Sequence, residues 1–257
     1  MSRPLIVSLS GGKDSTALLL MLLERKEPVH SAVFYDTGWE FPQMHGHLSA
    51  LAADIAPVPL VMLKPRIPFV EWMLTRVQRI RKGPRKGEIR YVGAGWPTRR
   101  WCTRIKVTAI DQYAKTVPGA IQCIGFAKGE EHRAKSKNMA GKGNFRFPLI
   151  EWGVDEPLAL SYCLEKKYNW GGLYDVFHRV SCFCCPHQRL ESLRKVRWRF
   201  PNLWSQMLYW DAAIAKNRPA VFQRKKSLSL HDLDARFFEE DRKLWLPGLS
   251  NIWMEAA

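Results

Sequence analysis

The residues best suited to chemistry in this sequence lie within its first fifteen positions. Two glycines and a lysine are flanked by hydroxyl and carboxyl side chains in Ser10-Gly11-Gly12-Lys13-Asp14-Ser15. Glycines let backbone N–H groups approach a ligand closely, and the N-terminus of a helix adds a partial positive charge. The pattern therefore predicts a cradle for phosphate, although a plain turn between a strand and a helix would also use a glycine pair. It differs from the longer Walker loop because the lysine follows the glycine pair directly.

A second candidate site contains sulfur. Cys182 and Cys185 form a C-x-x-C pair, whose spacing lets two thiolates share one metal ion. The six cysteines are unevenly spaced and partly adjacent, which is unlike a disulfide framework and favours metal binding or catalysis in a cytosolic enzyme. A redox-active disulfide between Cys182 and Cys185 is a further possibility. Cys123 and Cys163 are expected to be buried packing residues.

The charge of the chain predicts a polyanionic partner. Forty Lys and Arg residues stand against 24 Asp and Glu, a formal net charge of +16. Residues 76–106 contain eleven of these basic residues and a single acidic residue, Glu88. We expect nucleic acid there, with a solvated basic surface as the alternative. The candidate contacts are Arg79, Arg81, Lys82, Arg85, Lys86, Arg99 and Arg100. Tyr91, Trp96 and Trp101 could stack on bases or could pack locally.

The elements that must position these residues read as alternating strands and helices. Strands are expected at 5–9, 29–35, 60–63 and 120–126, and helices from about 14 to 23, 44 to 55, 70 to 81, 106 to 116 and 156 to 167. After the helix at 70 to 81, a loop or hairpin is expected up to Pro97, since glycine and proline interrupt that basic stretch. The region from Gln188 looks helical, with Trp198, Trp204, Trp210 and Phe237 in its core.

This order predicts an α/β fold with a doubly wound, mostly parallel sheet, whose ligands collect at the carboxyl ends of the strands. We expect a domain at 1–187 that carries a basic insertion at about 76–100, followed by a helical extension at 188–257. No apolar run is long enough to span a membrane, and no secretory signal is recognised, so a cytoplasmic protein without a membrane partner is expected.

Residues 10–15 resemble the PP-loop of ATP pyrophosphatases, which cleave ATP between the α and β phosphates. Four further motifs narrow the resemblance to the phosphoadenylylsulfate (PAPS) reductase branch and, within it, to the ATPases of DNA phosphorothioation. They are Asp36-Thr37-Gly38-Trp39-Glu40-Phe41-Pro42, Arg100-Trp101-Cys102-Thr103-Arg104-Ile105-Lys106, Gly125-Phe126-Ala127-Lys128-Gly129-Glu130-Glu131-His132-Arg133 and Cys182-Phe183-Cys184-Cys185-Pro186. The match covers residues 1 to about 190 and implies an adenine nucleotide alpha hydrolase-like fold.

The resemblance implies roles for individual residues. ATP is expected on the N–H groups of the PP-loop, with Lys13, Asp14, Ser15, Asp36 and Arg133 as catalytic residues. Asp14 is a candidate Mg²⁺ contact that could also cap the helix, and Asp36 could meet Mg²⁺ or nucleotide or only cap its own turn. Arg133 could neutralise phosphate or adenylate charge with Glu130 orienting it, or the two could form a surface pair. The nucleotide-binding set is Ser10, Gly11, Gly12, Lys13, Asp14, Ser15, Asp36, Gly125 and Glu130.

The resemblance also brings Cys102 to Cys182 and Cys185, where three cysteines would hold a [4Fe-4S] cluster, with zinc as the runner-up. Cys184, Cys163 and His187 are candidate fourth ligands. One departure disfavours sulfonucleotide reduction: those enzymes carry a nucleophilic cysteine near the C-terminus, whereas here the last cysteine is Cys185.

The expected function is adenylation of a nucleic acid, DNA rather than tRNA, for sulfur incorporation. The sulfur would come from a cysteine desulfurase, directly or through a carrier. The alternatives are tRNA thiolation, sulfonucleotide reduction, and a subunit that binds nucleotide and nucleic acid without turnover.

Overall fold

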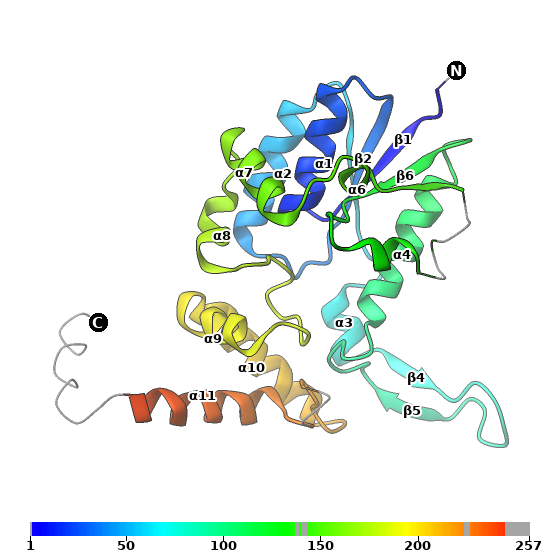
Figure 1. The fold of residues 1–257 in the computed structure, drawn as a ribbon. Coiled ribbons are helices and arrows are strands. Elements are labelled where there is room, and N and C mark those ends of the chain that lie inside the picture. Colours follow the sequence, from blue (N-terminus) through cyan, green and yellow to red (C-terminus); the bar gives the residue numbers. More distant parts are fainter. Residues whose placement is uncertain (1, 137–138, 140–142, 224–226, 245–257) are drawn as a thin grey trace. The chain divides into compact units, whose positions relative to one another are not determined.

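The structure is a computed structural model of the 257-residue chain. It describes residues 2–136, 139, 143–223 and 227–244. The chain forms two compact units (Figure 1). The first unit contains residues 1–69 and 101–183, and the second contains 70–100 and 184–257. The basic segment thus shares a unit with the C-terminal helices, a division that runs differently from the one expected along the sequence. Of the predicted extension, residues 224–226 and 245–257 lie outside the described residues.

A five-stranded parallel sheet forms the centre of the first unit. Its strands, in spatial order, are β3 (Leu60–Leu63), β2 (Val29–Tyr35), β1 (Leu5–Leu9), β6 (Ile121–Ile124) and β7 (Phe145–Arg146). All four neighbouring pairs are parallel, and Leu5 of β1 stands opposite Val29 on one side and Ile121 on the other. The direction in which strands are added to the sheet reverses at β1. The chain first adds β2 and β3 on one side of β1 and then places β6 and β7 on its other side. The predicted doubly wound α/β fold is confirmed.

Helices cover both faces of this sheet (Figure 1). They are α1 (Lys13–Glu24), α2 (Pro42–Asp54), α4 (Trp101–Ala114), α5 (Glu131–Ala134), α6 (Pro148–Glu151), α7 (Glu156–Glu165), the 3₁₀ helix η1 (Trp170–Gly172) and α8 (Leu173–Val176). Helix α7 packs beside α1, whereas α4 packs against β2. The central strands are apolar on both sides for this reason: Ile6, Val7, Val33 and Phe34 are fully buried.

A buried histidine joins α1 to α2. His47 of α2 is only 6% exposed, and its Nε2 lies 3.1 Å from the hydroxyl of Thr16 in α1. The rings of Trp170 and Tyr168 lie 4.7 and 5.5 Å away, centroid to centroid. Burial lowers the pKa of His47 to about 4. The imidazole is therefore neutral in the folded protein at physiological pH.

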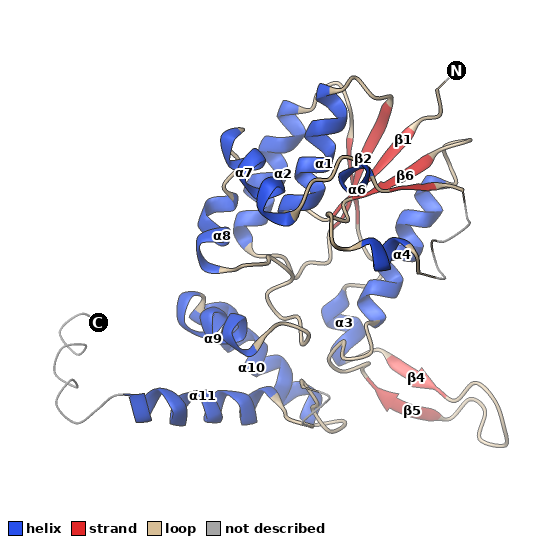
Figure 2. Cartoon of the chain, in the orientation of Figure 1, coloured by secondary structure: helices blue, strands red, loops and turns tan. Residues whose placement is uncertain are grey.

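The second unit combines a hairpin with helices (Figure 2). Its elements are α3 (Phe69–Leu74, with Phe69 in the first unit), β4 (Val77–Arg79), β5 (Ile89–Val92), α9 (Leu190–Arg199), α10 (Pro201–Ala215) and α11 (Leu230–Leu244). The predicted helix at 70–81 is wrong beyond Leu74. The amides of Thr75 and Arg76 both bond to the carbonyl of Glu71, which ends the helix, and the chain continues as β4, antiparallel to β5.

The C-terminal helices have a small core and an ion-pair network. Trp204, Trp210 and Phe237 are buried as predicted, whereas Trp198 is 57% exposed, so the prediction for Trp198 is wrong. The guanidinium of Arg197 on α9 meets two carboxylates of α11, Asp234 at 2.8 Å and Asp241 at 3.0 Å. Among the described helices, none combines the length and hydropathy needed to cross a bilayer.

Candidate active site

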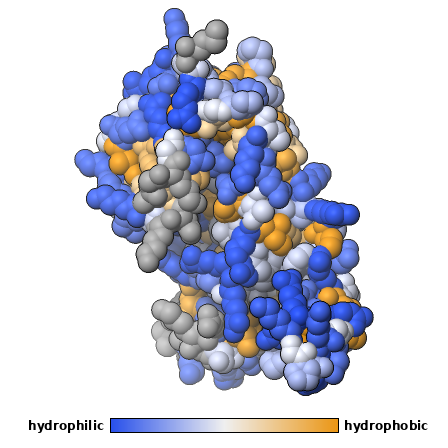
Figure 3. Space-filling view, turned by 90° about the vertical axis from the view of Figure 1, so that its right-hand side faces the viewer, coloured by the Kyte–Doolittle hydropathy of each residue, from blue (hydrophilic) through white to orange (hydrophobic). Residues whose placement is uncertain are grey.

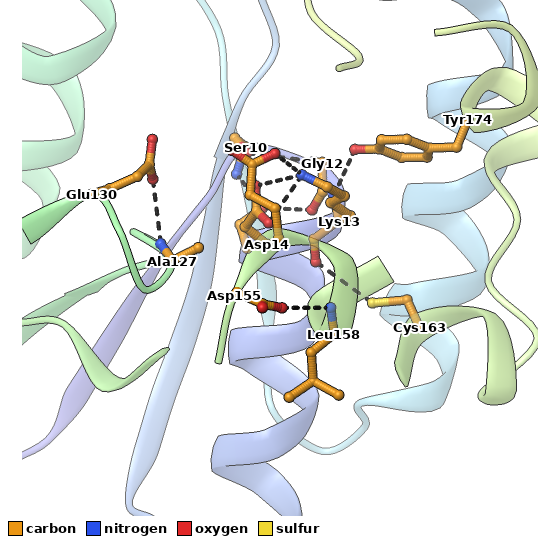
Figure 4. A network of polar contacts seen from close by, with 12 residues as sticks. Ser10, Gly12, Lys13, Asp14, Ala127, Glu130, Asp155, Leu158, Cys163 and Tyr174 are labelled. Atoms are coloured by element: carbon orange, nitrogen blue, oxygen red, sulfur yellow. Dashed lines mark hydrogen bonds and ion pairs between the residues drawn. The ribbon is translucent and has the colours of Figure 1, made fainter. Parts of the chain in front are cut away.

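The loop between β1 and α1 forms a closed hydrogen-bonded turn (Figure 4). The hydroxyls of Ser10 and Ser15 lie 2.9 Å apart, and the Ser15 hydroxyl donates to the carbonyl of Gly12 at 3.0 Å. Gly11 has a φ of +79°, and a Cβ there would come within 2.5 Å of the sulfur of Met44. Only glycine therefore fits at position 11, for conformation and for space. The loop presents the N-terminus of α1 at the carboxyl end of the central strand.

The neighbouring strand places a second glycine against this loop. Gly125 follows β6, and a Cβ on it would lie 3.0 Å from both the backbone nitrogen and the Cα of Ser15. Since β1 and β6 flank the point where the strand order reverses, the loop and Gly125 border the crevice in which doubly wound folds bind their ligands. The predicted nucleotide-binding positions 10–15 and 125 are thus brought together.

Lys13 is the buried charge of this site. Its side chain is 5% exposed, and its ammonium lies 2.6 Å from Oε2 of Glu156 and 3.2 Å from Oδ1 of Asp14. The hydrogen bond from Lys13 lowers the pKa of Glu156, whereas burial raises that of Asp14 against the opposing effect of the lysine. Two carboxylates therefore hold the ammonium in the position where a phosphate is expected.

Glu156 was missed by sequence reasoning, and the signal for it was indirect. Asp155 accepts a hydrogen bond from the amide of Leu158 at 2.9 Å and caps α7, with a proline in the first turn. That pattern predicts where the helix begins. It does not predict that Glu156 reaches a lysine 143 residues earlier in the chain.

Two aromatic residues bind the backbone of the loop. The hydroxyl of Tyr174 accepts the N–H of Lys13 at 2.8 Å, and the indole of Trp170 donates to the carbonyl of Gly11 at 2.7 Å. The thiol of Cys163 donates to the carbonyl of Lys13 at 3.5 Å. Burial raises the pKa of the Tyr174 hydroxyl, which stays protonated. Tyr174 thus occupies one of the backbone donors that a phosphate would use.

Asp36 directly follows β2 and takes part in a turn. Its Oδ1 accepts the N–H of Gly38 at 2.9 Å, and its Oδ2 lies 3.7 Å from the ammonium of Lys64. The structure therefore contains the turn-capping arrangement considered for Asp36. A role toward Mg²⁺ or nucleotide stays a prediction.

Glu40 belongs to the same turn and is half-buried. It accepts the hydroxyl of Thr37 at 2.7 Å and the amides of Thr37 and Trp39, both at 3.1 Å. Burial raises the pKa of its carboxyl group against these hydrogen bonds and the charge of Lys106.

Glu130 and Arg133 form the pair that the sequence suggested. The guanidinium donates to Oε1 of Glu130 at 2.5 Å and lies over the ring of Phe126, 4.1 Å from its centroid. Glu130 also accepts the amide of Ala127 at 3.3 Å. Because the Arg133 side chain is 39% exposed, it can meet an anion in solution. This arrangement is compatible with an orienting role and with a surface pair.

The cysteines divide between the two units. Cys102 on α4 and Cys182 belong to the first unit, whereas Cys184 and Cys185 belong to the second. The sulfur of Cys182 lies 3.7 Å from the hydroxyl of Thr37 and 4.0 Å from Oε1 of Glu40. Cys102 and Lys106 stand one turn apart on the same helix, and burial raises the pKa of the Cys102 thiol.

The part of the chain that the structure describes contains no cluster of three His, Cys, Asp or Glu side chains arranged to hold a metal ion. The donor chemistry still suits a thiolate-ligated metal, since Cys102, Cys182 and Cys185 are half-buried sulfur donors. Cys184 is fully buried, and so are Cys123 and Cys163, as predicted for packing residues.

The basic segment is a hairpin with an exposed tip. Every residue from 81 to 90 is exposed, and so are Arg79, Arg99 and Arg100. Two predicted stacking residues are buried instead: Trp96 is 3% exposed and Trp101 9%. Trp101 packs edge-on against Trp39, 5.7 Å between centroids, so the local-packing alternative is the correct one for both tryptophans.

Comparison with known proteins shows the family. The model of the phosphoadenosine phosphosulfate reductase domain matches residues 4–188. An uncharacterised protein of Methanocaldococcus jannaschii is 22% identical over 214 residues, which cover 79% of this chain and 40% of that protein. An uncharacterised 37.8 kDa protein in the gpa 5′ region of Escherichia phage 186 is 24% identical over 254 residues, which cover 82% of this chain and 75% of the phage protein. The chain thus spans less than half the length of its archaeal relative.

Among solved structures, a U34-tRNA thiolase, NcsA from Methanococcus maripaludis with its 4Fe–4S cluster, matches with a TM-score of 0.43 and 15% identity, covering 84% of this chain and 70% of that one. The family model accounts for well over half of the residues, and the chain belongs to the phosphoadenosine phosphosulfate reductase domain family.

Proposed function

We propose that the protein is an ATP pyrophosphatase that adenylates a nucleic acid, DNA rather than tRNA, so that sulfur can be incorporated. The observation that carries this proposal is the PP-loop at the reversal point of the sheet, with a buried lysine and two carboxylates at the N-terminus of α1. Such a site suits a polyphosphate bound together with Mg²⁺. Asp14 and Glu156 become available to the metal once phosphate takes over the ammonium of Lys13.

The chemistry follows from these groups. An oxygen of the nucleic acid forms a bond to the α-phosphorus of ATP while the bond from that phosphorus to the bridging oxygen breaks, and pyrophosphate leaves. Lys13, the loop N–H groups and Arg133 stabilise the charge that develops on the phosphoryl oxygens. In the second step sulfur replaces AMP. Sulfur from a cysteine desulfurase arrives as a persulfide, so two electrons from a thiol reductant bring it to the oxidation level of sulfide.

Cys102, Cys182 and Cys185 would hold an iron–sulfur cluster, with zinc as the alternative and Cys184 as a further candidate ligand. A bound cluster would offer an iron atom for a sulfur ligand. The chain's own contribution at Cys182 is a polar setting, since Thr37 and Glu40 lie within 4.0 Å of its sulfur.

The first test separates the ATP site from the nucleic-acid surface. The double change Asp14→Ala and Ser15→Ala removes a carboxylate and a loop hydroxyl, so we expect pyrophosphate release from ATP to fall at least 100-fold while affinity for DNA stays within about twofold. Pyrophosphate release is followed with a coupled assay and DNA affinity by fluorescence anisotropy. Equal loss of both would contradict the assignment of separate sites.

A second experiment addresses substrate and metal. Stimulation of pyrophosphate release by duplex DNA but not by tRNA supports DNA as the target, and the reverse result supports tRNA thiolation. Protein purified without oxygen should absorb at about 400 nm and contain iron and sulfide, as expected for cysteine-ligated clusters. Colourless protein with one zinc would contradict the cluster assignment.

A further inference from the structure

The hairpin of the second unit is a cationic ribbon with an exposed tip. Strands β4 and β5 pair through Val77 with Val92 and Arg79 with Ile89, and the ladder continues where the amide of Ile80 bonds to the carbonyl of Glu88 at 2.9 Å. The residues beyond it form a loop, drawn at the end of the ribbon in Figure 2. From 79 to 90 the hairpin carries one acid and six cations: Arg79, Arg81, Lys82, Arg85, Lys86 and Arg90.

The base of this ribbon is firmly held. Gly93 has a φ of +71°, and a Cβ there would come within 2.4 Å of the carbonyl oxygen of Met73. The guanidinium of Arg218 donates to the carbonyl of Ala94 at 3.1 Å and lies over the ring of Tyr91, 4.6 Å from its centroid. These contacts fix the base of the ribbon, so the strands need little ordering when the ribbon binds.

A buried carboxylate adds to this anchor. Asp211 of α10 is 1% exposed and accepts the indole N–H of Trp96 at 2.6 Å, just after the hairpin. The same carboxylate accepts the amide of Leu230 at the start of α11. Trp96 also packs edge-on against Phe222, 4.9 Å between ring centroids. The hairpin and the C-terminal helices therefore share one core.

The aromatic residues of the ribbon are used in packing. Single-stranded nucleic acids bind mainly where bases can stack on exposed rings. Here Trp96 is buried and Arg218 covers one face of Tyr91. The side chains offered outward are instead cations and two aliphatic residues on one face, Val77 at 44% and Ile89 at 52% exposure. In Figure 3 the lower part of the surface, which includes the hairpin, is mainly hydrophilic with isolated apolar side chains.

We propose that the β4–β5 hairpin is a groove-binding ribbon for B-form duplex DNA, an inference that rests on the proposed nucleic-acid substrate and names its form. The B-form major groove, about 12 Å wide, admits a two-stranded ribbon. The major groove of A-form RNA is too narrow for it. Cations on the strands and in the tip reach phosphates on both sides of the groove, and aliphatic side chains suit thymine methyl groups.

The test compares four probes of one sequence: duplex DNA, each single strand, and duplex RNA, each about 24 nucleotides long and labelled for anisotropy. We expect duplex DNA to bind at least tenfold more tightly than the others. The ribbon variant replaces four tip cations by glutamine: Arg81→Gln, Lys82→Gln, Arg85→Gln and Lys86→Gln. It should reduce the slope of log affinity against log salt by up to about 3.6, since each of the four lost phosphate contacts contributes about 0.9.

A matched control removes the same charge from the first unit. It carries Lys26→Gln, Lys115→Gln, Lys166→Gln and Lys167→Gln, all at exposed positions. We expect this variant to keep the preference for duplex DNA and nearly the full salt slope. Equal effects of the two variants would mean that only net charge matters, and tighter binding of single strands or duplex RNA would overturn the ribbon assignment.

The outcome separates this inference from the proposed function. If nucleic acid stimulates pyrophosphate release but the tip variant still binds duplex DNA like the unaltered protein, the ribbon inference fails and the proposed function stands. If the tip variant loses duplex binding while no pyrophosphate is released under any condition, the ribbon stands and the enzymatic proposal fails.

Discussion

Glu156→Gln tests how the proposed phosphate cradle is held in the absence of ATP. The substitution preserves the shape of the side chain and removes its charge, so Lys13 loses its partner at 2.6 Å and keeps Asp14 at 3.2 Å. The carboxylate competes with phosphate for the same ammonium. Hydrogen bonds to charged groups contribute about 1.5–3 kcal/mol. Because the Glu156 side chain is 36% exposed, we reduce this to about 1 kcal/mol for solvent screening.

Loss of the Glu156 carboxylate removes a competing interaction with Lys13 of about 1 kcal/mol. The Kd for ATP should therefore fall about fivefold. The assay is calorimetric titration with ATP in EDTA, so that Mg²⁺ does not mask the effect of the carboxylate. Glu165→Gln is the control, because it removes the same charge from an exposed position at the other end of α7. Unchanged affinity would show that the ion pair does not compete with ATP. Weaker binding would show that Glu156 positions Lys13 for its ligand, and either result would refute the reasoning.

Two further substitutions test the packing of the first unit. Gly125→Ala places a methyl group 3.0 Å from the backbone of Ser15, so we expect ATP affinity to fall about tenfold. Gly46→Ala in α2 has no described atom within 4 Å of the new Cβ and should stabilise the protein by about 1 kcal/mol in urea unfolding, with unchanged ATP affinity. If both variants bound ATP with the same affinity, the close approach of Gly125 to the backbone of Ser15 would be contradicted. His47 has a folded-state pKa of about 4 against an ordinary value of about 6.5. Between these pH values the unfolded chain therefore binds more protons than the folded one. The contribution of neutral His47 to the free energy of unfolding is fully present above pH 6.5 and decreases as the pH drops toward 4. By pH 5 the loss should be about 2 kcal/mol, and His47→Gln should lack it in urea titrations at pH 7 and 5. A variant with the same pH dependence as the unaltered protein would exclude His47 as its source.

The local features of this protein could be predicted from its sequence. The strand at 29–35 runs as expected, because a continuous apolar run is typical of a parallel strand buried on both faces, and the short apolar run at 60–63 forms the edge strand β3. The glycine pair after β1 predicts the anion cradle, since backbone conformation at Gly11 is set by that residue itself. The run of cations with glycine and proline at 83–87 predicts an exposed hairpin for the same local reason.

Predictions that depended on partners elsewhere in the chain were less reliable. The helix expected from 70 to 81 ends at Leu74 because the amides of Ala94 and Gly95 bond to the carbonyls of Trp72 and Met73, and β5 then pairs with β4. For Trp96 the sequence leaves stacking on bases and local packing open, and packing is correct because its indole donates to Asp211, 115 residues later in the chain. Trp198 looked like core and is exposed.

The sequence by itself determined the fold class, the position of the glycine loop after β1 and the basic character of the hairpin. These follow from the period of apolar residues, from glycine conformation and from charge, all of which are properties of neighbouring residues. Only the tertiary structure decided that Glu156 and Tyr174 occupy the cradle, 143 and 161 residues from Lys13 along the chain. Such contacts depend on how α7 and α8 pack against α1, which no local pattern specifies.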